Sequence, residues 1–212
     1  MDFTISPRIE DYRARIARFV DDELLPIEAD RANYDAHENI RKDLLQDLRA
    51  RAKAQGLWCL QLKEETGGQG LGLQGMAVCY EEMNRSIFGP VVFNSAAPDD
   101  GNMQVLEKVG TEKQKEEWLQ PIVRGDVQSA FVMTEPAPGS GSDPAGMMLT
   151  TAKKDGDSYV VRGRKWFITG AEESEHFILI ARTSDDARKG LSAFLHKKDT
   201  PGFRIDRRIP IM

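Results

Sequence analysis

The chain has little cysteine, with only Cys59 and Cys79 among its 212 residues. Two cysteines this far apart form no CxxC motif, and they are too few for a disulfide framework. Neither has a histidine or a cation beside it in the sequence, so a reactive thiolate is not favoured. We therefore expect both to be reduced, buried, small side chains.

Long hydrophobic runs are also lacking. The apolar run 177–181 is far shorter than the roughly 20 residues that cross a bilayer. The N-terminal segment 1–7 has no basic stretch followed by an apolar one, so no secretory signal is predicted. The sequence accordingly predicts a soluble, cytoplasmic protein that does not enter a membrane.

Positive charge is not in excess, because 29 Lys and Arg face 34 Asp and Glu and the net charge is −5. Nucleic-acid binding, which needs a basic surface, is therefore not expected. The three histidines, His37, His176 and His196, are widely separated and show no ligand spacing. With so few Cys and His residues, we expect no transition-metal site.

The period of the apolar residues changes along the chain. Helical spacing dominates up to Gly125, with Ser6 predicted to cap the first helix and Thr111 a later one. Beyond that point the pattern is that of short strands, predicted at 129–134, 148–153, 159–162, 165–169, 176–182, 191–196 and 203–209. We predict an α+β protein: an N-terminal all-α helical domain, 1–125, followed by an antiparallel β-sandwich or barrel domain, 126–212.

A glycine motif in the helical region, 70–75, fits the dinucleotide fingerprint GxGxxG. That fingerprint requires a strand directly before the first glycine and an acidic residue about 20 positions later. Here 61–69 intervene and 87–92 contains no acid. We interpret the motif as a loop between helices whose glycines provide turns.

Two segments of the β region carry candidate binding residues. The first is Phe131–Pro136 with the glycine- and serine-rich loop 139–146, whose backbone N–H groups could hold an anion such as pyrophosphate. The second is 163–171, where Trp166 and Phe167 would point to opposite faces of a strand, leaving one ring free for a planar ligand. Thr169 would share the face of Phe167. A surface loop and an aromatic pair that packs the core are the alternatives, and composition alone leaves them open.

Together these segments resemble the acyl-CoA dehydrogenase family. The resemblance rests on four motifs in the family's order, 24–26, 63–72, 133–136 and 165–170, and it covers essentially the whole chain. The segment 97–103 further resembles the subgroup with vertebrate family members ten and eleven. The resemblance implies a helical domain, a middle β domain and a C-terminal helical bundle, the last of which is not in this chain.

The resemblance also implies a set of site residues and a reaction. The FAD-binding residues it implies are Phe131, Met133, Thr134, Gly141, Ser142, Trp166, Phe167 and Thr169, and Ser142 would also lie near the acyl-CoA thioester. Ser140 competes with Ser142 for this role because the loop is longer than in the shortest members. The reaction would be α,β-dehydrogenation of a fatty acyl-CoA to a trans-2-enoyl-CoA in β-oxidation.

The resemblance places the catalytic base, a Glu, in the C-terminal bundle, so no residue of this chain is assigned as catalytic. We expect the middle domain to be incomplete at its end and the chain alone to be inactive, binding FAD weakly or not at all. An electron-transferring flavoprotein is the implied electron acceptor, and the full-length form would be a homodimer or homotetramer. A flavin oxidase or monooxygenase on the same scaffold and a truncated non-catalytic binding subunit remain as alternatives.

Overall fold

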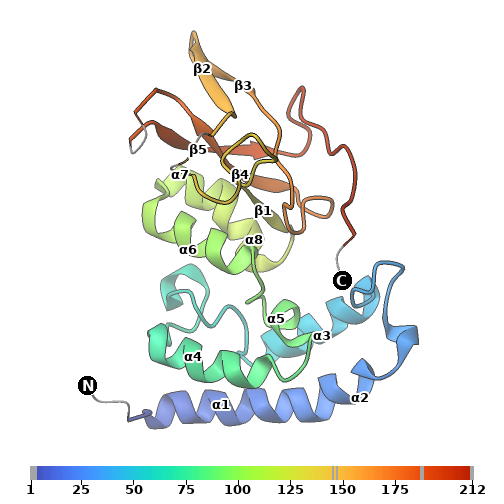
Figure 1. Cartoon of the computed structure of the whole chain (residues 1–212). Coiled ribbons are helices and arrows are strands. Elements are labelled where there is room, and N and C mark those ends of the chain that lie inside the picture. Colours follow the sequence, from blue (N-terminus) through green and yellow to red (C-terminus); the bar gives the residue numbers. More distant parts are fainter. Residues whose placement is uncertain (1–3, 145, 147, 187–188, 211–212) are drawn as a thin grey trace. The chain divides into compact units, whose positions relative to one another are not determined.

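The structure, a computed structural model, describes residues 4–144, 146, 148–186 and 189–210. The chain divides into two units, Met1–Gly125 and Asp126–Met212. Within these described residues, helices make up the first unit and the strands lie in the second (Figure 1). The chain is therefore α+β, with a helical part followed by a β part, as the change of period predicts. In the described part of the chain, the helices are too short or too polar to cross a membrane.

Helix α1 (Pro7–Phe19) begins where the sequence predicts. The Ser6 hydroxyl accepts a hydrogen bond from the Ile9 N–H at 3.3 Å, and Pro7 occupies the first helical position, where no N–H is needed. The buried residues Ile16 and Phe19 lie on its apolar face. This face packs against α4 (Gly72–Met83), which runs beside α1 (Figure 1).

The remaining helical elements of the first unit are, in chain order, η1 (Val20–Leu24), α2 (Leu25–Glu28), η2 (Arg31–Asn33), α3 (Lys42–Ala54), η3 (Glu64–Thr66), α5 (Gly89–Val92), α6 (Asp99–Val109), α7 (Glu112–Gln114), η4 (Lys115–Leu119) and α8 (Gln120–Arg124). Among them, α3 and α6 are the long ones and the others have five residues or fewer. Thr111 caps α7 in a reciprocal capping box with Gln114, as predicted for this residue.

Both cysteines are free and buried, which confirms the expectation from the sequence. Burial raises the pKa of the Cys59 thiol to about 12 and that of Cys79 to about 11. Both thiols are therefore protonated at neutral pH, and neither is poised as a nucleophile.

A buried asparagine joins three parts of the helical unit. The Asn94 side-chain amide donates to the Ile122 carbonyl at 3.0 Å and lies 3.1 Å from the Cys59 sulfur. Its own backbone is left-handed, with φ of 55°. Asn adopts this conformation more readily than most residues, so one side chain meets both the backbone and the hydrogen-bonding requirement of the site.

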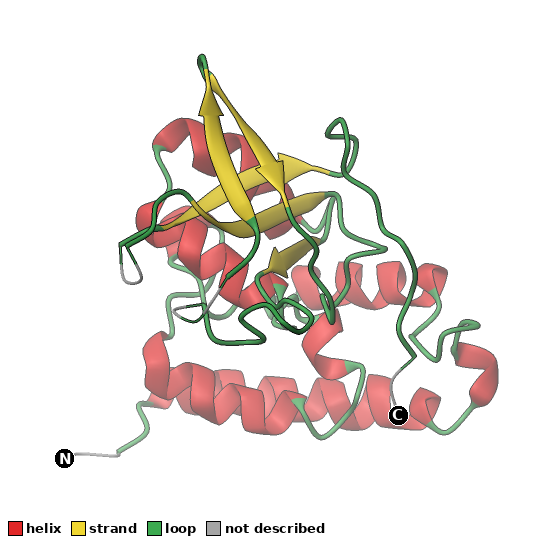
Figure 2. Ribbon diagram, turned by 45° about the horizontal axis from the view of Figure 1, so that its top comes forward, coloured by secondary structure: helices red, strands yellow, loops and turns green. Residues whose placement is uncertain are grey.

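The second unit contains one five-stranded sheet (Figure 2). Its strands are β1 (Ser129–Val132), β2 (Thr151–Asp155), β3 (Ser158–Arg162), β4 (His176–Arg182) and β5 (Leu191–Lys197). β2 pairs antiparallel with β3 through a turn at Gly156, and β4 pairs antiparallel with β5. β1 and β2, however, pair parallel with β4, so the prediction of a wholly antiparallel sheet was wrong. The long connection between β1 and β4 permits this parallel pairing.

Two predicted strands, 165–169 and 203–209, do not form among the described residues. In the first, Phe167 has a positive φ of 50°, which interrupts an extended chain. Trp166 and Phe167 therefore do not point to opposite faces; their rings meet edge to face, with centroids 4.8 Å apart. Thr169 was expected on the same face as Phe167 because side chains alternate along an extended strand, and this alternation does not apply where no strand forms.

Because the backbone at Asn94 is left-handed, we predict that Gly destabilises the fold less than Ala at this position. Asn94→Ala loses both amide contacts and adds a left-handed penalty, so we expect it to lower the free energy of unfolding by about 3 kcal/mol. Asn94→Gly should cost about 1 kcal/mol less, because glycine carries no such penalty. Urea denaturation of both variants measures the difference.

Asn84, which is exposed and has a φ of −77°, provides the control. There, Ala should be more stable than Gly, because the backbone is not left-handed. The same order at both positions would contradict the explanation.

Candidate functional site

The structure brings the two candidate segments together. The N–H of Trp166 donates to the carbonyl of Thr134 at 3.1 Å. Thr134 and Met133 follow directly after β1 and are half-buried, as is Phe131 within the strand. Residues more than 30 positions apart in the sequence thus form one continuous surface in the second unit.

The aromatic pair lies at the exposed side of this surface. Trp166 is 39% exposed and Phe167 54% exposed, so neither ring is buried in the core. The interpretation of the pair as core packing was therefore wrong. Thr169 is exposed and belongs to the turn that follows.

The glycine-rich loop returns to the same strand end. Its Gly141 carbonyl accepts a hydrogen bond from the Glu135 N–H at 3.0 Å, and Gly141 has a positive φ of 62° with open space where a side chain would be. Among the described atoms, no acceptor is found for the N–H groups of Gly141 and Ser142. Free, neighbouring N–H groups of this kind are suited to an anion.

The two candidate serines differ in exposure. Ser142 is exposed, whereas the Ser140 hydroxyl oxygen is buried and lacks a hydrogen-bond partner among the described atoms. A phosphate could approach Ser142 without rearrangement of the loop, which favours Ser142 over Ser140.

Sequence reasoning missed the ion pair that connects these segments. The Lys165 ammonium lies 3.2 Å from the Glu135 carboxylate, and the two side chains are only 7% and 2% exposed. Neither residue was singled out, because they lie 30 positions apart and exposed charges are the usual expectation. Each, however, stands next to a predicted ligand contact, Glu135 after Thr134 and Lys165 before Trp166, and this was the available signal.

The Glu135 carboxylate is strongly acidic. Burial by itself would raise its pKa, but hydrogen-bond donors on Thr150, the Leu149 N–H and Lys165 outweigh burial and lower the pKa to about 2. The carboxylate is therefore ionised at any physiological pH.

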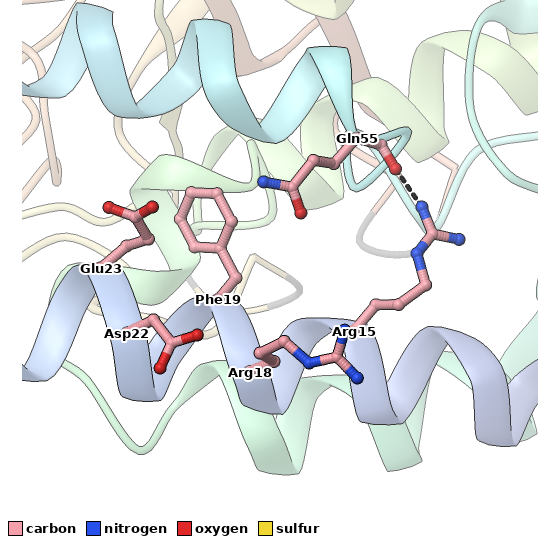
Figure 3. Close-up of a pocket in the computed structure, with 6 residues that line it drawn as sticks. All are labelled: Arg15, Arg18, Phe19, Asp22, Glu23 and Gln55. Carbon is pink, nitrogen blue, oxygen red and sulfur yellow. Dashed lines mark hydrogen bonds between the residues drawn. The ribbon is translucent and has the colours of Figure 1, made fainter.

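A surface depression lies in the first unit, beside α1 and the end of α3 (Figure 3). It is lined by Arg15, Arg18, Phe19, Asp22, Glu23 and Gln55. Arg15 donates to the Gln55 carbonyl, and Glu23 pairs with Arg51. Because two of its four charged side chains, Arg15 and Glu23, already bond to neighbouring residues, we do not assign it as the site. Likewise, no three His, Cys, Asp or Glu residues in the described part of the chain are grouped so as to hold a metal ion.

Comparison with known families agrees with this arrangement. The N-terminal domain of acyl-CoA dehydrogenase matches residues 6–126 and the middle domain matches residues 130–211. The chain belongs to the acyl-CoA dehydrogenase family. The resemblance stated from the four sequence motifs is thereby confirmed.

Individual relatives in the acyl-CoA dehydrogenase family are longer than this chain. FadE2 of Mycobacterium tuberculosis is 38% identical over 220 residues, which cover 100% of this chain and 53% of that protein. Acyl-CoA dehydrogenase family member 11 of Rattus norvegicus is 34% identical over 99% of this chain and 28% of that protein, in agreement with the subgroup resemblance. The chain thus spans about half the length, or less, of these relatives.

A solved structure of PigA with FAD and proline has the same fold as this chain. It superposes with a TM-score of 0.82 at 29% identity and covers 100% of this chain and 53% of that chain. Three features of this chain are suited to a ligand: the exposed rings of Trp166 and Phe167, the open space where a side chain of Gly141 would be, and the N–H groups of Gly141 and Ser142, for which the described atoms offer no acceptor. A planar ring system with an anionic diphosphate matches these features.

The low pKa of Glu135 predicts a loss of stability in acid. A carboxyl with a pKa of about 2 when folded and 4.5 when unfolded stabilises the fold above pH 4.5, and this contribution falls as the pH drops from about 4.5 to 2. Between about pH 6 and about pH 3, roughly 2 kcal/mol of it should be lost. Urea denaturation of the wild type and of Glu135→Gln at the two pH values measures this, because the difference between them should shrink in acid.

Glu172→Gln, which breaks an exposed ion pair with Arg208, makes the same charge change and is the control. A gap between wild type and Glu135→Gln that is equal at both pH values would refute the prediction.

Proposed function

We propose that this chain contributes the flavin-binding surface of an FAD-dependent dehydrogenase whose substrate is an acyl-CoA thioester. The main support is the hydrogen bond between Trp166 and Thr134, which joins the two candidate segments beside an exposed aromatic pair. Membership of the acyl-CoA dehydrogenase family agrees with it. The product would be a trans-2-enoyl-CoA, with an electron-transferring flavoprotein as acceptor and a homo-oligomer as the working form.

Each proposed contact has a distinct task. Phe131, Met133 and Thr134 would border the flavin ring on the side of β1, while Trp166, Phe167 and Thr169 would border it on the side of the second segment. Gly141 and Ser142 would hold the diphosphate, with Ser142 also near the thioester. When bound, FAD would supply the acceptor for the hydride that leaves the β-carbon of the substrate.

The chain's own part in this chemistry is orientation and the exclusion of water. Glu135 is one of two carboxylates that directly adjoin a proposed contact in sequence, the other being Asp143, but Glu135 is buried, ionised and held by several N–H donors. A base with a pKa of about 2 is too weak to remove an α-proton at neutral pH. We therefore assign no catalytic residue within this chain.

Direct binding of FAD tests the proposal, which requires the first of the two outcomes expected from the sequence, weak binding rather than none. In an NMR titration of the isotope-labelled chain with FAD, the amides of Thr134, Gly141, Ser142, Trp166 and Phe167 should shift together. Phe167→Ala and Trp166→Ala should each weaken binding up to about tenfold, since a ring contact contributes roughly 0.5–1.5 kcal/mol.

Tyr159→Ala is the matched control, because Tyr159 is a similarly exposed aromatic on β3 of the same unit. Shifts confined to other residues, or equal losses in all three variants, would overturn the assignment.

A second measurement concerns the reaction itself. When an acyl-CoA is added to the chain in the presence of saturating FAD, we expect no bleaching of the visible flavin band, because no residue of the chain is assigned to take the α-proton. Chemical reduction by dithionite should bleach the band and serves as the positive control. Stoichiometric bleaching by the acyl-CoA would show that a base within this chain has been overlooked.

A further inference from the structure

The buried ion pair of Glu135 and Lys165 is the strongest feature of the second unit that the proposed function leaves without a role. The two side chains are 2% and 7% exposed, so they are not available to a ligand. Each is nevertheless the immediate neighbour of a proposed flavin contact, Thr134 or Trp166. The Lys165 side chain is buried, whereas the ring of the next residue, Trp166, is exposed.

The Glu135 carboxylate organises two segments other than its own. It accepts hydrogen bonds from the N–H groups of Leu149 and Thr150, both at 2.7 Å, and a longer one from the Ser140 N–H at 3.3 Å. The backbone of Gly139 packs so closely on this side chain that a Cβ there would collide with the carboxylate. The start of the glycine-rich loop and the segment before β2 are therefore fixed against one acidic group.

The Lys165 ammonium completes the connection. It donates to the Met133 carbonyl at 2.7 Å as well as to Glu135 at 3.2 Å. The next residue, Trp166, donates its N–H to the Thr134 carbonyl, so two adjacent residues both bond to the segment that follows β1. One carboxylate and one ammonium thus tie together the strand end, the glycine-rich loop, the segment 149–150 and the aromatic segment.

We propose that Glu135 and Lys165 are positioning residues that hold the flavin-contacting backbone in register, an inference that rests on the proposed function. A buried ion pair carries a desolvation cost, and an apolar pair of similar volume is often equally stable. Apolar side chains, however, cannot fix the directions of three N–H groups and a carbonyl. Compared with an apolar pair, the ion pair therefore contributes to the positions of the ligand contacts rather than to the net stability of the fold.

The test uses the full 212-residue chain and two variants. Lys165→Met keeps an unbranched side chain as far as Cε and removes the ammonium, leaving the hydrogen bonds that the Leu149 and Thr150 N–H groups donate to Glu135 in place. Glu135→Gln removes the charge and sets an amide NH₂ against backbone N–H donors. Glu172→Gln, in an exposed pair of the same unit, is the control.

Two readouts are taken, and the first needs no ligand. In Lys165→Met, hydrogen exchange at the Trp166 amide should accelerate about tenfold, while the amides of Leu149 and Thr150 change by less than about twofold. In Glu135→Gln all three should accelerate. Amides of β4 in each variant report whether the unit is folded.

The second readout is the affinity for FAD, with the visible absorption of the bound flavin at equal saturation. Affinity should fall about tenfold in Lys165→Met, and the fine structure of the absorption band should change, since the contacts are displaced. Glu172→Gln should match the wild type in both readouts.

The possible failures are distinguishable. If the wild type binds FAD and Lys165→Met binds it equally well with an unchanged spectrum, the pair has only a structural role and this inference is wrong, while the proposed function stands. If the wild type shows no binding at millimolar FAD, the proposed function fails and the inference fails with it. Should Glu135→Gln not fold, Lys165→Met alone decides between these outcomes.

Discussion

The arrangement of the second unit depends on a charge that has been taken out of water. Glu135 is almost fully buried and meets the cost of burial with donors from Leu149, Thr150 and Lys165. Because those donors come from two segments that are distant from Glu135 in the sequence, satisfying one carboxylate also fixes the course of both segments. The exposed residues beside those segments thereby gain defined positions.

In the helical unit, a buried neutral side chain, Asn94, has the function that the buried Glu135 carboxylate has in the second unit. Asn94 is buried, left-handed and bonded to the Ile122 carbonyl, so one amide secures the backbone between α5 and α6 to α8. In both units the apolar residues provide the bulk of the core, whereas a buried polar side chain determines how a loop crosses it. The difference is that Glu135 adjoins an exposed surface with free N–H groups and aromatic rings.

What the sequence could predict was local. The helix caps at Ser6 and Thr111 depend on a few neighbouring residues, and the structure has both. Phe167 was assigned to a strand because its neighbours are aromatic and apolar, but its positive φ depends on contacts made by the whole segment. The parallel pairing of β1 with β4 was missed for a similar reason, since no local signal records the direction of a distant partner.

The site illustrates why a short motif does not separate binding from support. The segments 133–136 and 165–170 each contain an inward-facing charge beside outward-facing residues, and a resemblance in sequence covers both alike. A substitution at Glu135 would disturb the surface even if no ligand touched Glu135, because the N–H groups it holds would lose their acceptor. Burial is what assigns the roles: Trp166, Phe167 and Ser142 are open to a ligand, and Glu135 and Lys165 are not. The exposed residues therefore determine which ligand the surface can bind, and the buried residues determine how precisely the ligand contacts are placed.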